Sequence, residues 1–193
     1  MTKNIVFDCD EVLATFRYSL QRHTANRLGR PVYYNEITSF DIEDVFEELC
    51  IHRDVLTPMM LGNEFLYLPV EPYAREVVEA ARKEHSVYIV TARGFMDSAH
   101  EITSKWFEMN DIVVDEIIIA PPHVSKHTIL EDIGNVEIYV DDHPGHVYDA
   151  HRTGAAKTSY IMKRPWNVEL QKTHPHQIDC LIDLYPLFKE QKD

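Results

Sequence analysis

The sequence contains little cysteine and no long apolar segment. Its three cysteines, Cys9, Cys50 and Cys180, are far apart, which argues against a disulfide framework and is typical of a reducing compartment. No stretch approaches the roughly 18 consecutive apolar residues of a membrane span. The N-terminus also lacks the apolar core of a signal peptide. We therefore expect a cytoplasmic protein that makes no membrane contact.

An excess of positive charge is also absent. The 193-residue chain has 19 Lys and Arg against 32 Asp and Glu, which gives a net charge of −13 at pH 7. Such a chain repels a polyphosphate backbone unless a local basic track offsets the repulsion, so we expect no long nucleic acid as a partner. A small phosphorylated ligand remains compatible with this charge, because a metal ion and one or two cationic side chains are enough to hold it.

What the sequence does have is an alternation of strand-like and helix-like segments. Short, nearly continuously apolar runs are typical of strands buried on both faces of a sheet, and they occupy residues 4–8, 86–91, 115–120, 136–141 and 157–162. Helical patterns occupy 71–85, 97–110, 125–134 and 144–154, and near the C-terminus the apolar residues Ile178, Leu181, Ile182 and Tyr185 repeat at helical spacing. This order predicts an α/β fold, a Rossmann-like parallel sheet of about five strands flanked by helices.

One long interval interrupts the alternation. Residues 14–71 hold no convincing strand, and two of their segments, 16–29 and 41–50, have helical patterns. We interpret residues 14–71 as a small helical cap inserted after the first strand. Residues 1–13 and 72–193 then form the core domain.

Polar side chains follow the predicted strands where each strand ends. Ligands of an open parallel sheet bind beyond the carboxyl ends of its strands. At these ends the sequence places Asp8, Asp10, Thr91, Ala92, Arg93, Lys126, Asp141 and Asp142. Carboxylates this close repel one another unless a cation lies among them. A solvated turn explains the Asp-x-Asp motif taken alone, but the set of motifs favours a phosphate-transfer site.

In this order the motifs resemble the four motifs of the haloacid dehalogenase superfamily of phosphohydrolases, and they span most of the chain, residues 8–142. Within the superfamily the sequence is most similar to the 5'(3')-deoxyribonucleotidases and their bacterial and phage relatives. The similar stretches are "DCDEVLATF", "NEFLYLPVEPYAREVV", "VYIVTAR", "SKHTILEDI", "IYVDDHP" and "KRPWN". The sequence departs from these relatives at Glu11, where glycine is usual, and at "TAR", which replaces a Ser/Thr-Ser/Thr-Pro segment.

The resemblance implies a mechanism for the acidic residues. Asp8 would attack phosphorus and form an aspartyl-phosphate, and Asp10 would act first as general acid and then as general base. Mg²⁺ would be the cofactor, because it prefers oxygen ligands. Its ligands would be Asp8, the carbonyl of Asp10, and Asp141 or Asp142, with the sequence leaving open which of the last two binds directly.

The resemblance also implies roles in binding the phosphate and the substrate. Thr91, Ala92 and Lys126 would hold the phosphate. Arg93 would contact the substrate, although a surface salt bridge is an equal alternative. Trp166, in "KRPWN", would lie near the base or close the site, and the alternative is an ordinary packed tryptophan.

Aromatic residues of the cap are candidates for choosing the substrate. Aromatic faces suit a nucleobase, and the cap offers Phe16, Tyr18, Phe40 and Phe46. Helix packing explains most of them equally well. We assign Phe16 to the substrate site.

The histidines in "DDHPGHVYDAH" raise a zinc alternative. His143, His146 and His151 do not have the spacing of an H-E-x-x-H helix or of a cysteine–histidine finger. Pro144 and Gly145 also make a rigid pair of ligands from His143 and His146 less plausible. We therefore expect these histidines on the surface or in support of the site.

Taken together, the motifs predict a Mg²⁺-dependent phosphatase for small nucleotides, a 5'(3')-deoxyribonucleotidase whose partner is a nucleoside monophosphate. Two alternatives keep the chemistry and change the substrate: 3'-phosphate ends of nucleic acid, or a non-nucleotide metabolite. A catalytically silent binding protein is a third alternative, and the presence of Asp8, Asp10 and Lys126 disfavours it. The sequence leaves the base, the sugar and a homodimeric state open.

Overall fold

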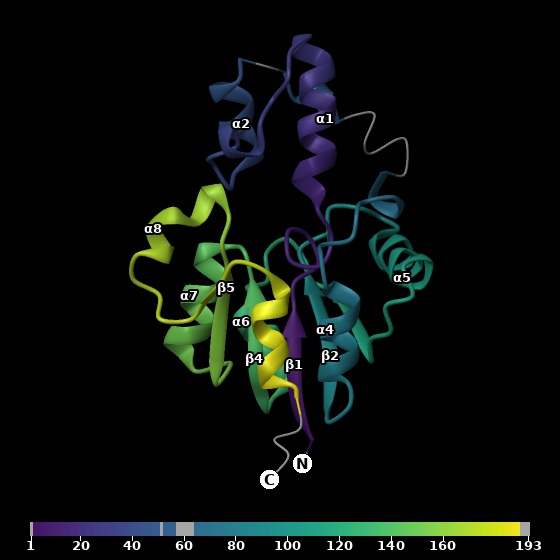
Figure 1. Cartoon of the computed structure of the whole chain (residues 1–193), viewed down its shortest axis with the longest axis vertical. Helices are drawn as coiled ribbons and strands as arrows, with labels where there is room; N and C mark the ends of the chain where they lie inside the picture. The colour runs from purple at the N-terminus through teal and green to yellow at the C-terminus, as the bar shows by residue number, and fades with distance from the viewer. Residues whose placement is uncertain (1, 51, 57–63, 190–193) are drawn as a thin grey trace.

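A parallel β-sheet forms the centre of the computed structural model, which describes residues 2–50, 52–56 and 64–189 (Figure 1). The strand order is β3-β2-β1-β4-β5-β6, and neighbouring strands pair in parallel. The strands are β1 (Lys3–Phe7), β2 (His85–Thr91), β3 (Glu116–Ile119), β4 (Val136–Asp141), β5 (Thr158–Met162) and β6 (Gln177–Ile178). The predicted α/β fold is therefore confirmed, with a short sixth strand added to the expected five.

Helices cover both faces of the sheet. Successive side chains of a strand point to opposite faces, so Ile5 and Phe7 of β1 pack into one apolar core while Val6 packs into the other. Because both faces are buried, the strands appear in the sequence as continuous apolar runs. The helices are α4 (Ala74–Ala81) and α5 (Ala99–Met109) on the first face, and α6 (Lys126–Ile133) and α7 (Pro144–Thr153) on the second.

The C-terminal segment differs from the predicted α-helix. Ile178 belongs to β6, and a 3-10 helix, η5 (Leu181–Leu187), follows it. Leu181 and Leu184 are buried in the core, and their spacing of three residues matches the 3-10 repeat, whereas Ile182 of the expected helical pattern is exposed. Pro186 lies inside η5 and has no backbone N–H to continue an α-helical ladder.

Helices α1 (Phe16–Leu28) and α2 (Ile42–Glu48) lie beyond the carboxyl ends of the strands (Figure 1). They occupy the interval predicted as a cap, together with the 3-10 helices η1 (Tyr34–Glu36), η2 (Arg53–Leu56) and η3 (Glu64–Leu66). Leu20, Phe46 and Val55 form a small core within this segment. Cap residues 51 and 57–63 lie outside the described residues, and the domain boundaries at 14 and 71 stay a prediction. No helix in the described ranges is long and apolar enough to cross a membrane.

The strand order positions the site. The chain crosses from β1 to β2 on one side and returns to β4 on the other, and such a reversal opens a crevice at the carboxyl end of the first strand. The register pairs Phe7 with Ile89 and with Val140. Asp8, the next residue, donates its N–H to the carbonyl of Val140 (2.9 Å) and thus comes beside Asp141.

Candidate active site

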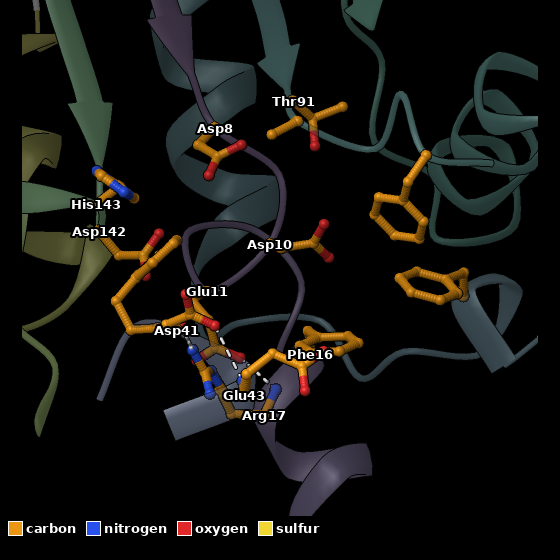
Figure 2. Close-up of a pocket in the computed structure, with 14 residues that line it drawn as sticks. Asp8, Asp10, Glu11, Phe16, Arg17, Asp41, Glu43, Thr91, Asp142 and His143 are labelled. Carbon is orange, nitrogen blue, oxygen red and sulfur yellow. Dashed lines mark hydrogen bonds between the residues drawn. The ribbon is translucent and has the colours of Figure 1, made fainter. Parts of the chain in front are cut away.

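A cavity of about 560 Å³ lies between the carboxyl ends of the strands and the cap segment (Figure 2). Its volume falls within the range of small-molecule sites, about 300–1,000 Å³. The strand ends contribute Asp8, Asp10, Thr91, Ala92 and Asp142 to its wall. The remaining lining residues are Glu11, Phe16, Arg17, Phe40, Asp41, Glu43, Phe65, Phe95 and His143. The cavity thus unites predicted site residues from three separate stretches of the chain.

Three buried carboxylates and one lysine form the floor of the site. Asp8, Asp141 and Asp142 each place an oxygen within 4.8 Å of the other two. The Nζ atom of Lys126 lies 2.9 Å from Asp8 Oδ1 and 2.8 Å from Asp141 Oδ2. Lys126 opens α6, and its side chain is buried. Lys126 therefore contacts both the first acidic motif, through Asp8, and the last one, through Asp141.

Asp141 and Asp142 have different surroundings. Asp141 is fully buried, and it accepts hydrogen bonds from Lys126 Nζ, from the hydroxyl of Tyr139 and from the backbone N–H of His143 (2.7 Å). Asp142 lines the cavity, and its Oδ2 accepts from Trp166 Nε1 (2.8 Å). Asp142 is thus the better placed of the two to bind a metal directly, while Asp141 holds Lys126.

The charges of this cluster are incompletely balanced. Burial and the neighbouring Asp141 and Asp10 raise the pKa of Asp8 to about 7, although Lys126 opposes this shift. Burial, together with Asp141 and Asp8, also raises the pKa of Asp142 well above its usual range. Burial opposes ionisation of Lys126, but Asp141 and Asp8 outweigh it and hold the pKa of this lysine above its usual value. An all-oxygen group with excess negative charge fits a hard divalent cation such as Mg²⁺.

Asp10 is held by a buried arginine. Arg93 Nε donates to Asp10 Oδ2 (2.8 Å) and Nη2 donates to Oδ1 (2.6 Å), while Nη1 donates to Thr103 Oγ1 (3.1 Å). Asp10 also lines the cavity, whereas Arg93 is 1% exposed and is absent from the lining. Arg93 is therefore not a surface salt bridge: it is buried and binds both carboxylate oxygens of Asp10, and its contact with a substrate stays a prediction.

Thr91 and Ala92 lie at the end of β2, where phosphate binding was predicted. Thr91 is 1% exposed and its Oγ1 has no hydrogen-bond partner in the described part of the chain. A buried hydroxyl beside a cavity without a partner is suited to donate to a ligand oxygen. The following Gly94 lets this loop pack tightly, because a Cβ there would lie 2.6 Å from the carbonyl oxygen of Ala120.

Glu11 shows why glycine is usual at its position. Its φ of 61° lies in the left-handed region, which favours glycine. Its buried side chain accepts from the backbone N–H of Arg17 and from the hydroxyl of Tyr34 (2.6 Å), and its carbonyl accepts from Arg164 Nη2 (2.6 Å). Burial raises the pKa of Glu11 despite these donors. From the sequence, Glu11 stood out only as a departure. Arg17 lies in no motif, and Arg164 belongs to "KRPWN" but was assigned no role.

The predicted aromatic residues separate into two groups. Phe16 and Phe40 line the cavity, and the ring of Phe16 stacks on Phe65 at 5.5 Å between centroids. Phe46 is buried in the cap core, and Tyr18 is 59% exposed and lies outside the cavity lining. Two further lining residues, Phe65 in "NEFLYLPVEPYAREVV" and Phe95 just after "VYIVTAR", were assigned no role from the sequence.

Trp166 also lies outside the cavity lining. Its indole N–H binds Asp142, and its ring carries the guanidinium of Arg17 at 4.6 Å. In this structure Trp166 contacts the acidic cluster through Asp142, and its role toward a base stays a prediction.

The histidines do not assemble a zinc site in the described residues. His143 and His146 stack at 4.1 Å between centroids, whereas the ring of His151 contacts His174 instead. The one group of potential metal ligands found among these residues is Asp8, Asp141 and Asp142. His143 lines the cavity and caps α7 by accepting from the N–H of His146 (3.2 Å).

Comparison with known proteins gives similarity at the level of structure. No protein-family model matches the chain, and no curated protein matches it. The haloacid dehalogenase-like hydrolase SP0104 of Streptococcus pneumoniae is 16% identical, with a TM-score of 0.69 over 97% of this chain and 99% of the other. The defluorinating L-2-haloacid dehalogenase Rha0230 is 15% identical, with a TM-score of 0.60 over 97% and 95% of the two chains. YfnB of Bacillus subtilis, assigned as a hydrolase of this type and solved with magnesium, is 13% identical, with a TM-score of 0.60 over 97% and 98%. The chain therefore has the fold of the haloacid dehalogenase-like hydrolases.

Proposed function

We propose that the protein is a Mg²⁺-dependent phosphatase for phosphate monoesters of small nucleotides, of the 5'(3')-deoxyribonucleotidase type. The observation that carries this proposal is the cluster of Asp8, Asp141 and Asp142 around Lys126 at the wall of the cavity. Transfer of a phosphoryl group depends mainly on positioning and on neutralising charge. This cluster supplies a nucleophile, oxygen ligands for a cation and a fixed positive charge in one place.

Asp8 and Asp142 would hold Mg²⁺, since both line the cavity. When bound, Mg²⁺ supplies positive charge that offsets the oxygens of the phosphoryl group. Lys126 keeps Asp8 oriented and adds a second positive charge. Thr91, whose hydroxyl has no partner among the described residues, would donate to a phosphoryl oxygen.

The reaction would proceed in two halves. An oxygen of Asp8 forms a bond to phosphorus while the bond from phosphorus to the leaving oxygen breaks, and protonated Asp10 gives its proton to that oxygen. Asp10 then takes a proton from water, whose oxygen bonds to phosphorus and displaces the Asp8 carboxylate. Inorganic phosphate leaves, and both aspartates are regenerated. Asp10 lines the cavity while both of its oxygens accept from Arg93, so the same contact that fixes its side chain leaves it beside the site.

A phosphatase accounts for this site better than a dehalogenase does. A halide ion leaves without a proton, whereas the alkoxide released from a phosphate monoester needs the proton that Asp10 would give, so only the phosphatase reaction uses a general acid at this position. Polymer ends are disfavoured as substrates, because the net charge of −13 repels nucleic acid. Small nucleotides fit the volume and the phenylalanine lining of the cavity.

The test measures phosphate release from a panel of nucleoside monophosphates and sugar phosphates, with Mg²⁺ and with EDTA. We expect Mg²⁺-dependent release, strongest for nucleotides, and its loss in Asp8→Asn. Asp111→Asn is the matched control, since Asp111 is 77% exposed and is not among the lining residues of the cavity. Retained turnover in Asp8→Asn, or halide release from 2-haloacids without phosphate release, would contradict the proposal.

A further inference from the structure

Glu11 holds a backbone conformation that is unfavourable for any residue other than glycine. Its φ of 61° lies in the left-handed region, where a side chain is strained. Glu11 directly follows Asp10, lines the cavity and is 3% exposed. Glycine would adopt the same turn without strain. An interaction that offsets the strain is therefore expected from the carboxylate, which glycine lacks.

The carboxylate of Glu11 binds two separate parts of the cap segment. Its Oε1 accepts from the backbone N–H of Arg17 in the first turn of α1 (Figure 2). Its Oε2 accepts from the hydroxyl of Tyr34 in η1 (2.6 Å). A negative charge at the start of a helix also interacts favourably with the helix dipole. Glu11 therefore fastens both α1 and η1 to the loop that follows β1.

Arg164, which follows β5, holds the loop of Glu11 from the side of the core. Its Nη2 and Nε donate to the carbonyl oxygen of Glu11 (2.6 and 3.1 Å). Its Nη2 also lies 3.1 Å from Glu71 Oε1, at the other end of the cap segment. The side chains of Arg164 and Glu71 are mostly buried, so this ion pair is shielded from solvent. Arg164 thus joins the two connections by which the chain enters and leaves the cap segment.

Trp166 makes a second contact between the core and the cap segment. It belongs to the part of the core that follows β5, yet it is buried in an apolar cluster with Ile37 and Val45 of the cap segment. The ring of Tyr34 lies against it at 5.7 Å between centroids. The cap segment therefore cannot lift from the core unless Tyr34 leaves Glu11 and Trp166 leaves this cluster.

We infer that Glu11 and Tyr34 form a latch that holds the cap segment over the cavity. Arg164 and Trp166 are the fixed points of this latch on the core. The hydrogen bond of the latch ends on a buried carboxylate, and hydrogen bonds to charged groups are stronger than those between neutral groups. The latch keeps the cap side of the cavity in place against the acidic floor of the site. This inference is independent of the proposed function, because its test needs no substrate.

The experiment follows solvent exchange of the Trp166 indole N–H by NMR. This N–H is buried on Asp142 (2.8 Å), so the latch predicts that it exchanges when the cap segment lifts. Tyr34→Phe removes the donor of the latch and keeps the ring on Trp166. Glu11→Gly removes the acceptor, relieves the strained φ and keeps the carbonyl that Arg164 binds. Each variant should accelerate the exchange about 10- to 150-fold, the effect of losing a hydrogen bond to a charged group.

Two controls separate opening of the latch from general loss of stability. The indole N–H of Trp106, buried on the carbonyl of Leu68 in the main core (2.8 Å), should keep its exchange rate in the same spectra. Tyr33→Phe is the matched control, because it makes the same substitution at the preceding position, where the residue is 64% exposed. It should leave the exchange of both indoles unchanged.

The double variant tests whether both changes act through one bond. Glu11→Gly with Tyr34→Phe should exchange no faster than the faster single variant, since the two substitutions remove the same interaction. Unchanged exchange of Trp166 in both single variants would overturn the inference. Additive acceleration in the double variant, or equal acceleration at Trp106, would overturn it as well. A wild type that releases no phosphate would contradict the proposed function and leave the latch to be judged by the exchange rates.

Discussion

The proposed function predicts that replacing Trp166 with phenylalanine weakens Mg²⁺ binding while every proposed metal ligand stays in place. Trp166 Nε1 donates to Asp142 Oδ2 at 2.8 Å in a buried environment, and this bond lowers the pKa of Asp142 against the larger effect of burial. Phenylalanine keeps an aromatic ring beneath Arg17 but removes the donor and part of the buried ring volume.

The size of the effect follows from the charge on the acceptor. A hydrogen bond to a charged group contributes about 1.5–3 kcal/mol, and loss of a partner that orients a metal ligand typically costs about 10- to 100-fold in metal affinity. We therefore expect the Mg²⁺ concentration for half-maximal activity to rise about 10- to 100-fold, with kcat at saturating Mg²⁺ changing much less.

The assay is a Mg²⁺ titration of phosphate release, supported by calorimetry of Mg²⁺ binding. Trp106→Phe is the control for the general loss of a buried indole, since Trp106 is fully buried and its Nε1 donates to the carbonyl of Leu68 (2.8 Å), not to the acidic cluster. An unchanged Mg²⁺ requirement in Trp166→Phe, with only a lower melting temperature as in Trp106→Phe, would refute the reasoning.

Three further predictions concern stability and specificity. Lys126→Met leaves Asp8 and Asp141 without their shared cation. We therefore expect loss of activity and a loss of about 3–5 kcal/mol in the free energy of unfolding. A loss below about 1 kcal/mol in urea unfolding would contradict this expectation. Phe46→Ala should cost up to about 3–5 kcal/mol and leave the ranking of nucleotides unchanged, because Phe46 belongs to the cap core; a changed ranking in the phosphate-release panel would show a role in the site. Burial lowers the pKa of His174, so its contribution to stability is present above about pH 6.5 and is lost as the pH falls below it. The urea midpoints at pH 8 and pH 5.5 should therefore differ less in His174→Gln than in the wild type. The same difference in both proteins would contradict this role of His174.

The sequence could predict those features that depend on local pattern. Continuous apolar runs located five strands. Successive side chains of a strand point to opposite faces of the sheet, so a parallel sheet that is covered on both faces needs apolar residues at successive positions. The two-residue strand β6 was missed, since Gln177 and Ile178 are too few to form a pattern. The order of the strands and of the polar residues that follow them then brought Asp8, Thr91 and Asp142 to one cavity.

Tertiary structure alone decided the contacts of each of these residues. Asp141 and Asp142 are neighbours of the same type, and only the buried Tyr139 and Lys126 on one and Trp166 on the other distinguish them. In the same way, Arg93 reaches Asp10 across 83 positions of the chain.

The surroundings of Arg17 also depend on tertiary structure. Its sequence neighbours mark an ordinary helix start, and its guanidinium lies against Phe40 and Trp166 only because α1 lies over the cavity. Local sequence determined which residues reach the carboxyl ends of the strands, since backbone geometry repeats from residue to residue. The partner of each polar group depended on packing between segments far apart in the chain, which no local period encodes.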